Sequence, residues 1–218
     1  MIELLLKVLA SYLIGSLIGG LIVGKLRGGV DIRTLGSGNA GGTNALRTQG
    51  KSFALWVMII DIGKGIVATR LIAPLPLQGL GLASAGGLSE WLPVACGLAA
   101  IVGHVYPVWY GFRGGKGVAT LVGVVFGVEP MLLLAVLLVW LVMVVVFGFV
   151  SLASIVAALS IVVVVPATGM QPYEPLLSFG VVVALLVAFT HRSNIARIRE
   201  GTEPRARRLW LLGRRRAS

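Results

Sequence analysis

The uncharged apolar stretch of residues 131–165 constrains the fold of this chain more than any other feature. It contains no charged residue, and as one helix it would extend for ~52 Å at ~1.5 Å per residue. The hydrocarbon core of a bilayer is only ~30 Å thick, so this length exceeds one crossing. We expect the stretch to fold into a hairpin of two spans at residues 147–151, around Gly148.

Further apolar segments approach or reach the ~20 residues that a crossing requires. They are residues 2–24, 53–72, 91–109 and 175–190. The stretch 117–128 would be only ~18 Å long as a helix, which predicts a short or re-entrant helix. With that helix counted as a crossing, the chain is predicted to be an all-α integral membrane protein, a polytopic bundle of seven transmembrane helices.

The composition agrees with a membrane protein. The chain is 57% hydrophobic and 12% charged, and a soluble domain has roughly twice that charged fraction. The net charge of +11 does not require a nucleic-acid partner, because basic loops orient membrane proteins in the bilayer. We therefore expect no nucleic-acid partner. Residues 1–218 are predicted to form one membrane-integral domain, with 194–218 as a basic cytoplasmic tail. Glu3 stands where a secretion signal would be basic, so we expect no cleavable signal.

The basic residues predict the orientation. The loop 25–52 carries five basic residues against one acid, and residues 191–218 carry nine arginines against two acids. With seven crossings, these segments and the basic loop 110–117 fall on one side, which the positive-inside rule makes the cytoplasm. The N-terminus is then outside and the C-terminus inside. Arg70 is the exception, and at a helix end its long side chain can reach the interface.

Asp61 and Lys64 lie within the predicted span 53–72. They are three residues apart and therefore neighbours on one helix face. Each costs ~2.5–3.5 kcal/mol at the centre of a membrane helix, so we expect both to face the protein interior or a wet cavity. A structural ion pair and a functional role are both compatible with this pattern.

Two loops on the predicted cytoplasmic side combine glycines with polar and basic residues, a pattern that suits phosphate. In the first, residues 36–44, hydrogen-bonding side chains are followed by a basic residue that can hold phosphate in a bidentate contact. The candidates in this first loop are Ser37, Asn39, Thr43, Asn44 and Arg47. The second loop joins an expected helix end before Pro107 to a helix that begins at Val118. Its candidates are His104, Arg113, Gly114, Gly115, Lys116 and Gly117.

A third polar segment follows the last predicted span. If the helix continues past Thr190, His191 and Asn194 share a face, and a histidine there can move a proton near neutral pH. Glu203 is expected to pair with an arginine. The histidines, cysteine and acids are too few or too scattered for a metal site, so no metal and no cofactor is expected.

Together these three segments resemble the motifs of the bacterial acyl-phosphate:glycerol-3-phosphate acyltransferases. Asp61, Lys64 and Gly65 are similar to that family as well, whereas Gly42 stands where the family is expected to have alanine. The resemblance implies transfer of a fatty acyl group from a long-chain acyl phosphate to the 1-hydroxyl of glycerol 3-phosphate. The expected products are 1-acylglycerol 3-phosphate (lysophosphatidate) and phosphate, made at the cytoplasmic face of the bacterial inner membrane. A monomer is compatible with the sequence.

The resemblance also suggests roles for the residues. We expect Lys116, the backbone of 114–117 and Arg47 to hold the phosphate of glycerol 3-phosphate. Ser37, Asn39 and Asn194 are expected to position the acyl phosphate, and His191 or His104 to take the proton of the attacking hydroxyl. The phosphate of the acceptor is an alternative base. Asp61, Lys64 and Glu203 are expected to support the site.

Two other functions, a transporter and a lipid-binding scaffold, would each use part of this sequence. A transporter of an organic phosphate would use Asp61 and Lys64 at mid-membrane, but it usually shows an internal repeat, and no clear repeat is found. A non-enzymatic scaffold would bind anionic lipid through its arginine-rich end, at ~1 kcal/mol per basic residue. That function leaves the loop 36–44 without a purpose.

Overall fold

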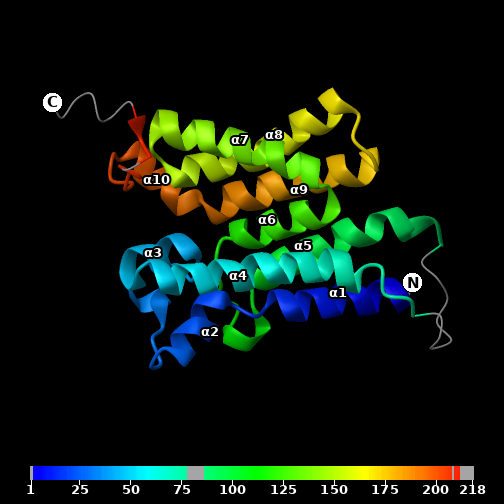
Figure 1. Ribbon diagram of the computed structural model, residues 1–218, viewed down its shortest axis with the longest axis horizontal. Helices are drawn as coiled ribbons and strands as arrows, with labels where there is room; N and C mark the ends of the chain where they lie inside the picture. The colour runs from blue at the N-terminus through cyan, green and yellow to red at the C-terminus, as the bar shows by residue number, and fades with distance from the viewer. Residues whose placement is uncertain (1, 78–85, 208, 212–218) are drawn as a thin grey trace. The chain divides into compact units, whose positions relative to one another are not determined.

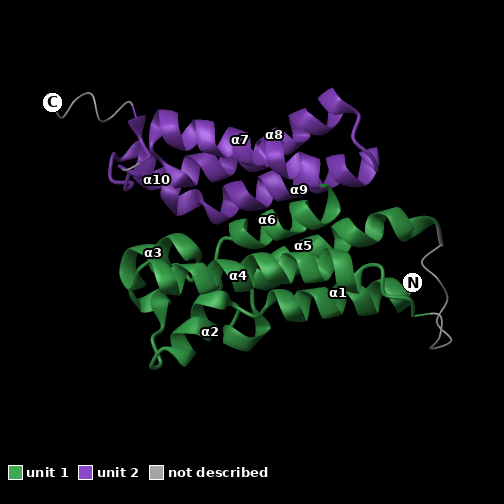
Figure 2. Cartoon of the chain, in the orientation of Figure 1, with its two compact units in different colours: residues 1–129 green, residues 130–218 purple. Residues whose placement is uncertain are grey.

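The computed structural model describes residues 2–77, 86–207 and 209–211, and every regular element in these ranges is a helix (Figure 1). The chain folds into two compact units, residues 1–129 and 130–218 (Figure 2). We describe each unit by itself.

The described residues of the first unit form six α-helices. They are α1 (Ile2–Gly15), α2 (Gly19–Leu26), α3 (Gly42–Gln49), α4 (Lys51–Val67), α5 (Leu92–Val105) and α6 (Val118–Val128). The π-helix η2 (Ala68–Ile72) extends α4, and short 3₁₀ helices lie at η1 (Ile32–Thr34), η4 (Gly86–Trp91) and η5 (Val108–Tyr110). Within this unit α1 packs along α5, and α4 packs along α6.

The second unit consists of α7 (Pro130–Phe147), α8 (Val150–Thr168), α9 (Tyr173–Thr190) and the short α10 (Arg192–Arg199). The predicted hairpin is confirmed, because α7 ends at Phe147 and Gly148 turns the chain with a positive φ of 78°. Helix α8 packs between α7 and α9. Gly180 allows the close approach of α9 to α8, since a Cβ there would lie 2.7 Å from Cγ2 of Ile161.

Among the residues that the structure describes, five helical segments are long and apolar enough to cross a membrane. They are Lys51–Ile72, Gly87–Tyr110, Pro130–Phe147, Val150–Thr168 and Tyr173–Thr190. A sixth crossing is obtained if α1 and α2 count as one broken span, and α6 is shorter than the rest. The all-helical membrane fold is therefore confirmed, whereas seven crossings and the orientation stay predictions.

The predicted span over residues 2–24 is not one continuous helix. The helix breaks after Gly15 and resumes at Gly19 with a bend of 46°. Two polar side chains of α4 satisfy the backbone at the break: Lys64 Nζ donates to the Leu17 carbonyl at 2.8 Å, and Asp61 Oδ1 accepts from Gly19 N at 3.1 Å. Backbone groups in a membrane need such partners because hydrocarbon supplies none.

The glycines around the break allow neighbouring helices to pack closely. A Cβ on Gly15 would collide with the backbone of Ala100 on α5, and one on Gly19 would lie 2.8 Å from the Val57 carbonyl on α4. Because the helix is bent between them, the two glycines serve two different contacts.

Candidate active site

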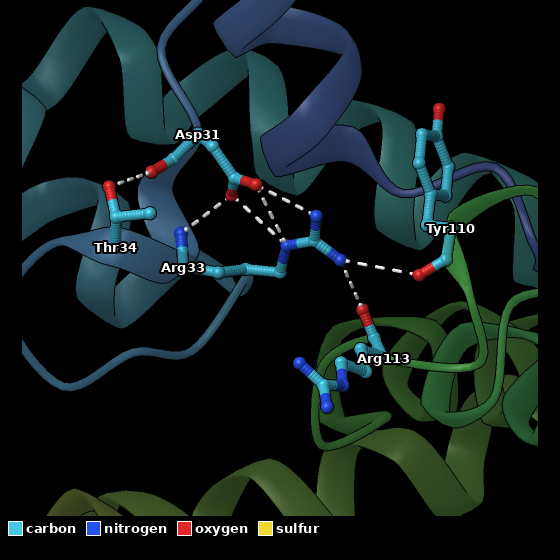
Figure 3. A network of polar contacts seen from close by, with 5 residues as sticks. All are labelled: Asp31, Arg33, Thr34, Tyr110 and Arg113. Atoms are coloured by element: carbon cyan, nitrogen blue, oxygen red, sulfur yellow. Dashed lines mark hydrogen bonds and ion pairs between the residues drawn. The ribbon is translucent and has the colours of Figure 1, made fainter.

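The loop between α2 and α3 is joined to the loop before α6 by Arg33 (Figure 3). Its guanidinium bonds both oxygens of Asp31 and also donates to the Arg113 carbonyl at 2.9 Å and the Tyr110 carbonyl at 3.4 Å. The hydrogen bond from Arg33 holds the pKa of Asp31 below its ordinary value, against the effect of burial. The carboxylate thus stays ionised, and the two loops that the sequence selected lie side by side.

Asn44, on the first turn of α3, fixes the shape of its loop. Its side chain is buried, and its Nδ2 donates to the carbonyls of Ile32, Leu35 and Asn39 at 2.9–3.0 Å. Its Oδ1 accepts from Ser37 N at 2.9 Å. Since both amide hydrogens are used within the loop, Asn44 is better suited to holding the loop than to binding phosphate.

The other candidates of this loop point outward. Ser37, Thr43 and Arg47 are exposed, and the Ser37 hydroxyl has no hydrogen-bond partner among the described residues. Asn39 turns the loop, because its Oδ1 accepts from Gly41 N at 2.9 Å. These side chains are therefore accessible to a substrate.

The glycines of the second loop serve close packing. Gly114 N donates to the Val105 carbonyl at 3.2 Å, and Gly115 N donates to the His104 carbonyl at 3.0 Å. A Cβ on Gly114 would collide with the His104 carbonyl, and one on Gly115 would collide with Nε2 of the His104 ring. The prediction that both N–H groups cradle phosphate is therefore not supported by this geometry.

The N-terminus of α6 offers the N–H groups that Gly114 and Gly115 do not. Gly117 precedes the helix with a φ of 83°, and its carbonyl accepts the first helical hydrogen bond, from Leu121 N at 2.8 Å. The first N–H groups of a helix have no partner within it, and they point toward the position an anion takes. Lys116 precedes Gly117 and is partly exposed, so a positive side chain accompanies these N–H groups.

Three ionisable side chains meet beneath this loop. Lys64 Nζ lies 2.9 Å from Asp61 Oδ1 and 2.8 Å from Nδ1 of His104, and all three residues are at most 5% exposed. The sequence placed His104 at the end of its helix, and α5 does end one residue later, at Val105. It did not reveal that Asp61 and Lys64 contact this histidine, because the residues lie 40 or more positions apart.

The second unit holds its own polar cluster around Glu203. The carboxylate accepts from Asn194 Nδ2 at 2.6 Å, from Ser151 Oγ at 2.7 Å and from Arg197 Nε at 2.8 Å. Burial raises the pKa of Glu203, but hydrogen bonds from Asn194, Ser151 and Arg197 outweigh it, and the net shift is downward. Pairing with an arginine was expected, whereas nothing in the sequence pointed to Ser151.

His191 lies at the junction of two helices. The condition for its sharing a helical face with Asn194 is not met, because α9 ends at Thr190 and α10 begins at Arg192. Its Nδ1 lies 2.8 Å from the Val187 carbonyl. A carbonyl can only accept, so we assign the proton to Nδ1, and Nε2 of the neutral ring is then the basic nitrogen.

Each unit therefore gathers part of the predicted set. The first brings His104, Asp61 and Lys64 together beside Gly115, and the second brings Asn194 to Glu203. Arg33 was missed as a residue that organises the site, although the Asp31-x-Arg33 spacing is a local signal for it. Within the described ranges no three His, Cys, Asp or Glu residues are grouped to hold a metal ion.

Comparison with known proteins identifies the family. The family model for glycerol-3-phosphate acyltransferase matches residues 5–201. A glycerol-3-phosphate acyltransferase of Staphylococcus aureus (strain JH9) is 42% identical over 210 residues, covering 95% of this chain and 99% of the relative. One of Synechococcus sp. (strain CC9902) is 40% identical over 202 residues, covering 92% and 94%.

Solved structures agree with this result. The crystal structure of PlsY (YgiH), an integral membrane glycerol 3-phosphate acyltransferase, in its glycerol 3-phosphate form has a TM-score of 0.78 and 39% identity, over 93% of this chain and 94% of that one. Its lysophosphatidic acid form has a TM-score of 0.77 over the same shares. This multi-pass membrane protein belongs to the glycerol-3-phosphate acyltransferase family.

Proposed function

We propose that the protein transfers a fatty acyl group from a long-chain acyl phosphate to the 1-hydroxyl of glycerol 3-phosphate. The family supports the acceptor and the reaction class, and the related PlsY structures carry glycerol 3-phosphate in one form and lysophosphatidic acid in the other. The observation that carries the proposal is the N-terminus of α6, where the positive side chain of Lys116 precedes a helix whose first N–H groups have no partner within it.

The reaction is an acyl transfer from a mixed anhydride. The 1-hydroxyl oxygen attacks the acyl carbonyl carbon, the bond from that carbon to the phosphate oxygen breaks, and inorganic phosphate leaves with the bonding electrons. The product is lysophosphatidate. The anhydride is already activated, so binding and orientation of two phosphate-bearing substrates supply much of the catalysis.

We assign the phosphate contacts to Lys116, the first N–H groups of α6 and Arg47. The loops in which they lie are fixed by Asn44 and Arg33, which hold backbone in place without needing a substrate. Thr43 and Arg113 are exposed and remain candidates for further phosphate contacts. Ser37 and Asn39 are the proposed polar contacts to the acyl phosphate.

We propose His191 as the acceptor of the hydroxyl proton. With Nδ1 donating to the Val187 carbonyl, Nε2 is the nitrogen that can take a proton. Replacing His191 by glutamine should lower kcat by roughly 10²–10⁴-fold if it is the general base. Retention of full kcat would favour the phosphate of the acceptor as the base.

The topology completes the proposal. Seven crossings require α1–α2 and α6 each to traverse the bilayer, and the basic loops then lie on the cytoplasmic side of a bacterial inner membrane.

Two alternative functions lose support, the transporter and the scaffold. Asp61 and Lys64, which a transporter would need for its substrate, are engaged with each other and with the break after α1.

The scaffold alternative is weakened because the start of the basic tail is engaged with the protein. Ala206 N donates to the Gly148 carbonyl at 2.7 Å, and Trp210 Nε1 donates to the Val146 carbonyl at 3.1 Å. The Arg205 guanidinium lies over the rings of Phe149 and Trp210, 4.5 and 3.9 Å from their centroids. Truncation after residue 211 removes Arg214, Arg215 and Arg216 and keeps these contacts, and an acyltransferase should keep its turnover.

The decisive experiment is incubation of purified protein with acyl phosphate and glycerol 3-phosphate in the absence of acyl-CoA. Formation of lysophosphatidate and phosphate is expected. Lys116→Ala should raise the KM for glycerol 3-phosphate strongly, by roughly 10- to 100-fold for a lost charged hydrogen bond. Lys25→Ala, which removes an exposed lysine at the end of α2, should not. An unchanged KM in Lys116→Ala would remove its phosphate role.

A further inference from the structure

The three N–H groups of Lys64 all have acceptors. Its ammonium nitrogen lies 2.8 Å from the Leu17 carbonyl, 2.9 Å from Asp61 Oδ1 and 2.8 Å from Nδ1 of His104. A lysine ammonium has three donors and no acceptor capacity. Three acceptors surround this nitrogen and match the three donors of an ammonium, so each of the three contacts takes one proton of Lys64.

This count decides which nitrogen of His104 carries hydrogen. Nδ1 has to accept from Lys64, so the proton of a neutral ring sits on Nε2. The alternative is Nδ1–H donating to Asp61 Oδ1, but that contact is 3.4 Å long. It would also set an N–H against the Lys64 ammonium at 2.8 Å. The shorter contact therefore assigns the Nε2–H tautomer.

The N–H of Nε2 is directed at the second loop. A Cβ on Gly115 would collide with Nε2, so the ring nitrogen lies directly against that glycine. Within the described ranges Nε2 has no hydrogen-bond partner, and His104 is 2% exposed. The N–H of Nε2 is therefore available to a ligand beside Gly115, which directly precedes Lys116.

We propose that Lys64, oriented by Asp61, is a positioning residue that makes His104 a proton donor, whose Nε2–H binds a phosphate oxygen of a substrate beside Gly115 and Lys116. The inference rests on the proposed function, because it assigns a ligand to that site. A phosphate oxygen is the fitting partner, since it is acceptor-only when ionised and lies beside the cation of Lys116. His104 then does not take the hydroxyl proton, and His191 remains the histidine proposed for that step.

The tautomer can be read from the resting protein by ¹⁵N NMR of imidazole-labelled material. The chain has only two histidines, so His191→Gln purified with a histidine-free tag leaves His104 as the one imidazole. We expect a protonated, pyrrole-type shift at Nε2 and an unprotonated, pyridine-type shift at Nδ1. The reverse pattern, or a doubly protonated ring at the pH of the assay, would overturn the assignment.

The role of Lys64 is tested by Lys64→Met in the same background. The spectrum should lose its fixed tautomer, and in the otherwise unaltered chain the KM of one substrate should rise roughly 10- to 100-fold with a smaller change in kcat. Lys7→Met is the matched control, because Lys7 is also 3% exposed and paired with a carboxylate four residues away. It should leave the His104 spectrum as it was. An unchanged spectrum in Lys64→Met refutes the positioning role.

Titration identifies the source of the phosphate. Glycerol 3-phosphate and a non-hydrolysable acyl phosphonate are added separately to the labelled protein, and the one that binds at Nε2 should shift that resonance and be the substrate whose KM rises in Lys64→Met. If neither compound shifts the Nε2 resonance, the proposal that a substrate phosphate binds there is refuted. Absence of acyl transfer to glycerol 3-phosphate would instead end the proposed function, and it would leave the tautomer measurement intact.

Discussion

Glu203→Gln removes the charge at the centre of the second unit's polar cluster while preserving its shape. The carboxylate is 7% exposed and accepts three hydrogen bonds, two on Oε1 and one on Oε2. A glutamine has one acceptor oxygen, so its NH₂ group would face a donor, from Arg197 on one side or from Ser151 and Asn194 on the other. The segment after α10 should consequently loosen from α8.

The size of the loss follows from these contacts. A hydrogen bond to a charged group contributes ~1.5–3 kcal/mol, and leaving a buried donor unpaired costs ~1–3 kcal/mol. With one bond lost and two weakened, we expect the free energy of unfolding to fall by about 2–4 kcal/mol. Glu200→Gln is the control, because Glu200 is exposed at the end of α10, and it should change stability by less than ~0.5 kcal/mol.

The pH dependence provides the sharper readout. The pKa of Glu203 is lower in the folded protein than its ordinary value of 4.5, so the stabilisation is fully present above that value. It is lost as pH falls through the folded pKa. Unfolding in detergent, followed by circular dichroism from neutral to acid pH, should show a gap between wild type and Glu203→Gln that closes toward acid. A gap of constant size, or an equal loss in Glu200→Gln, would refute the reasoning.

Three further substitutions address the first unit. Asn44→Ala should leave the loop carbonyls and Ser37 N without their hydrogen-bond partners. It should lower kcat/KM at least 10-fold, since ~1.4 kcal/mol corresponds to one tenfold step. Wild-type kinetics would contradict the role of Asn44 in holding the loop. Gly42→Ala should cost under ~1.5 kcal/mol and keep turnover, because the added Cβ lies 2.6 Å from the flexible Sδ of Met58; a dead enzyme would show that the glycine does more. Arg33→Ala should raise the KM for glycerol 3-phosphate, and faster proteolysis of residues 31–41 should accompany it; unchanged cleavage would show that the loop is held by other contacts.

Several features of the fold could be predicted from the sequence because each depends on local chemistry. The uncharged length of 131–165 required a turn, and Gly148 marked it. Pro107 placed the end of α5, which stops at Val105, and α6 begins at Val118 as expected. The polar loops were found because glycines, amides and basic residues concentrate there.

The differences arose where hydrogen bonds outside the local sequence pattern decide the structure. Nothing near residue 16 announces the break after α1, since its freed backbone is satisfied by Asp61 and Lys64 more than 40 positions later. The N–H groups of Gly114 and Gly115 looked available, but the end of α5 accepts both. In both cases the role of a residue is determined by a partner that the local sequence pattern does not show.

The buried lysines of the first unit show how charge inside an apolar helix can mark irregular backbone. Lys7 donates to the Ala73 carbonyl, just past the π-helix that ends at Ile72, and is paired with Glu3. Lys64 donates to the Leu17 carbonyl at the break after α1 and is paired with Asp61. Each ammonium therefore supplies a donor where helix geometry leaves a carbonyl unsatisfied, and its carboxylate offsets the cost of burying the charge. Only Lys64 also reaches an ionisable ring, and that third contact gives it a role in binding beyond the structural role that both lysines share.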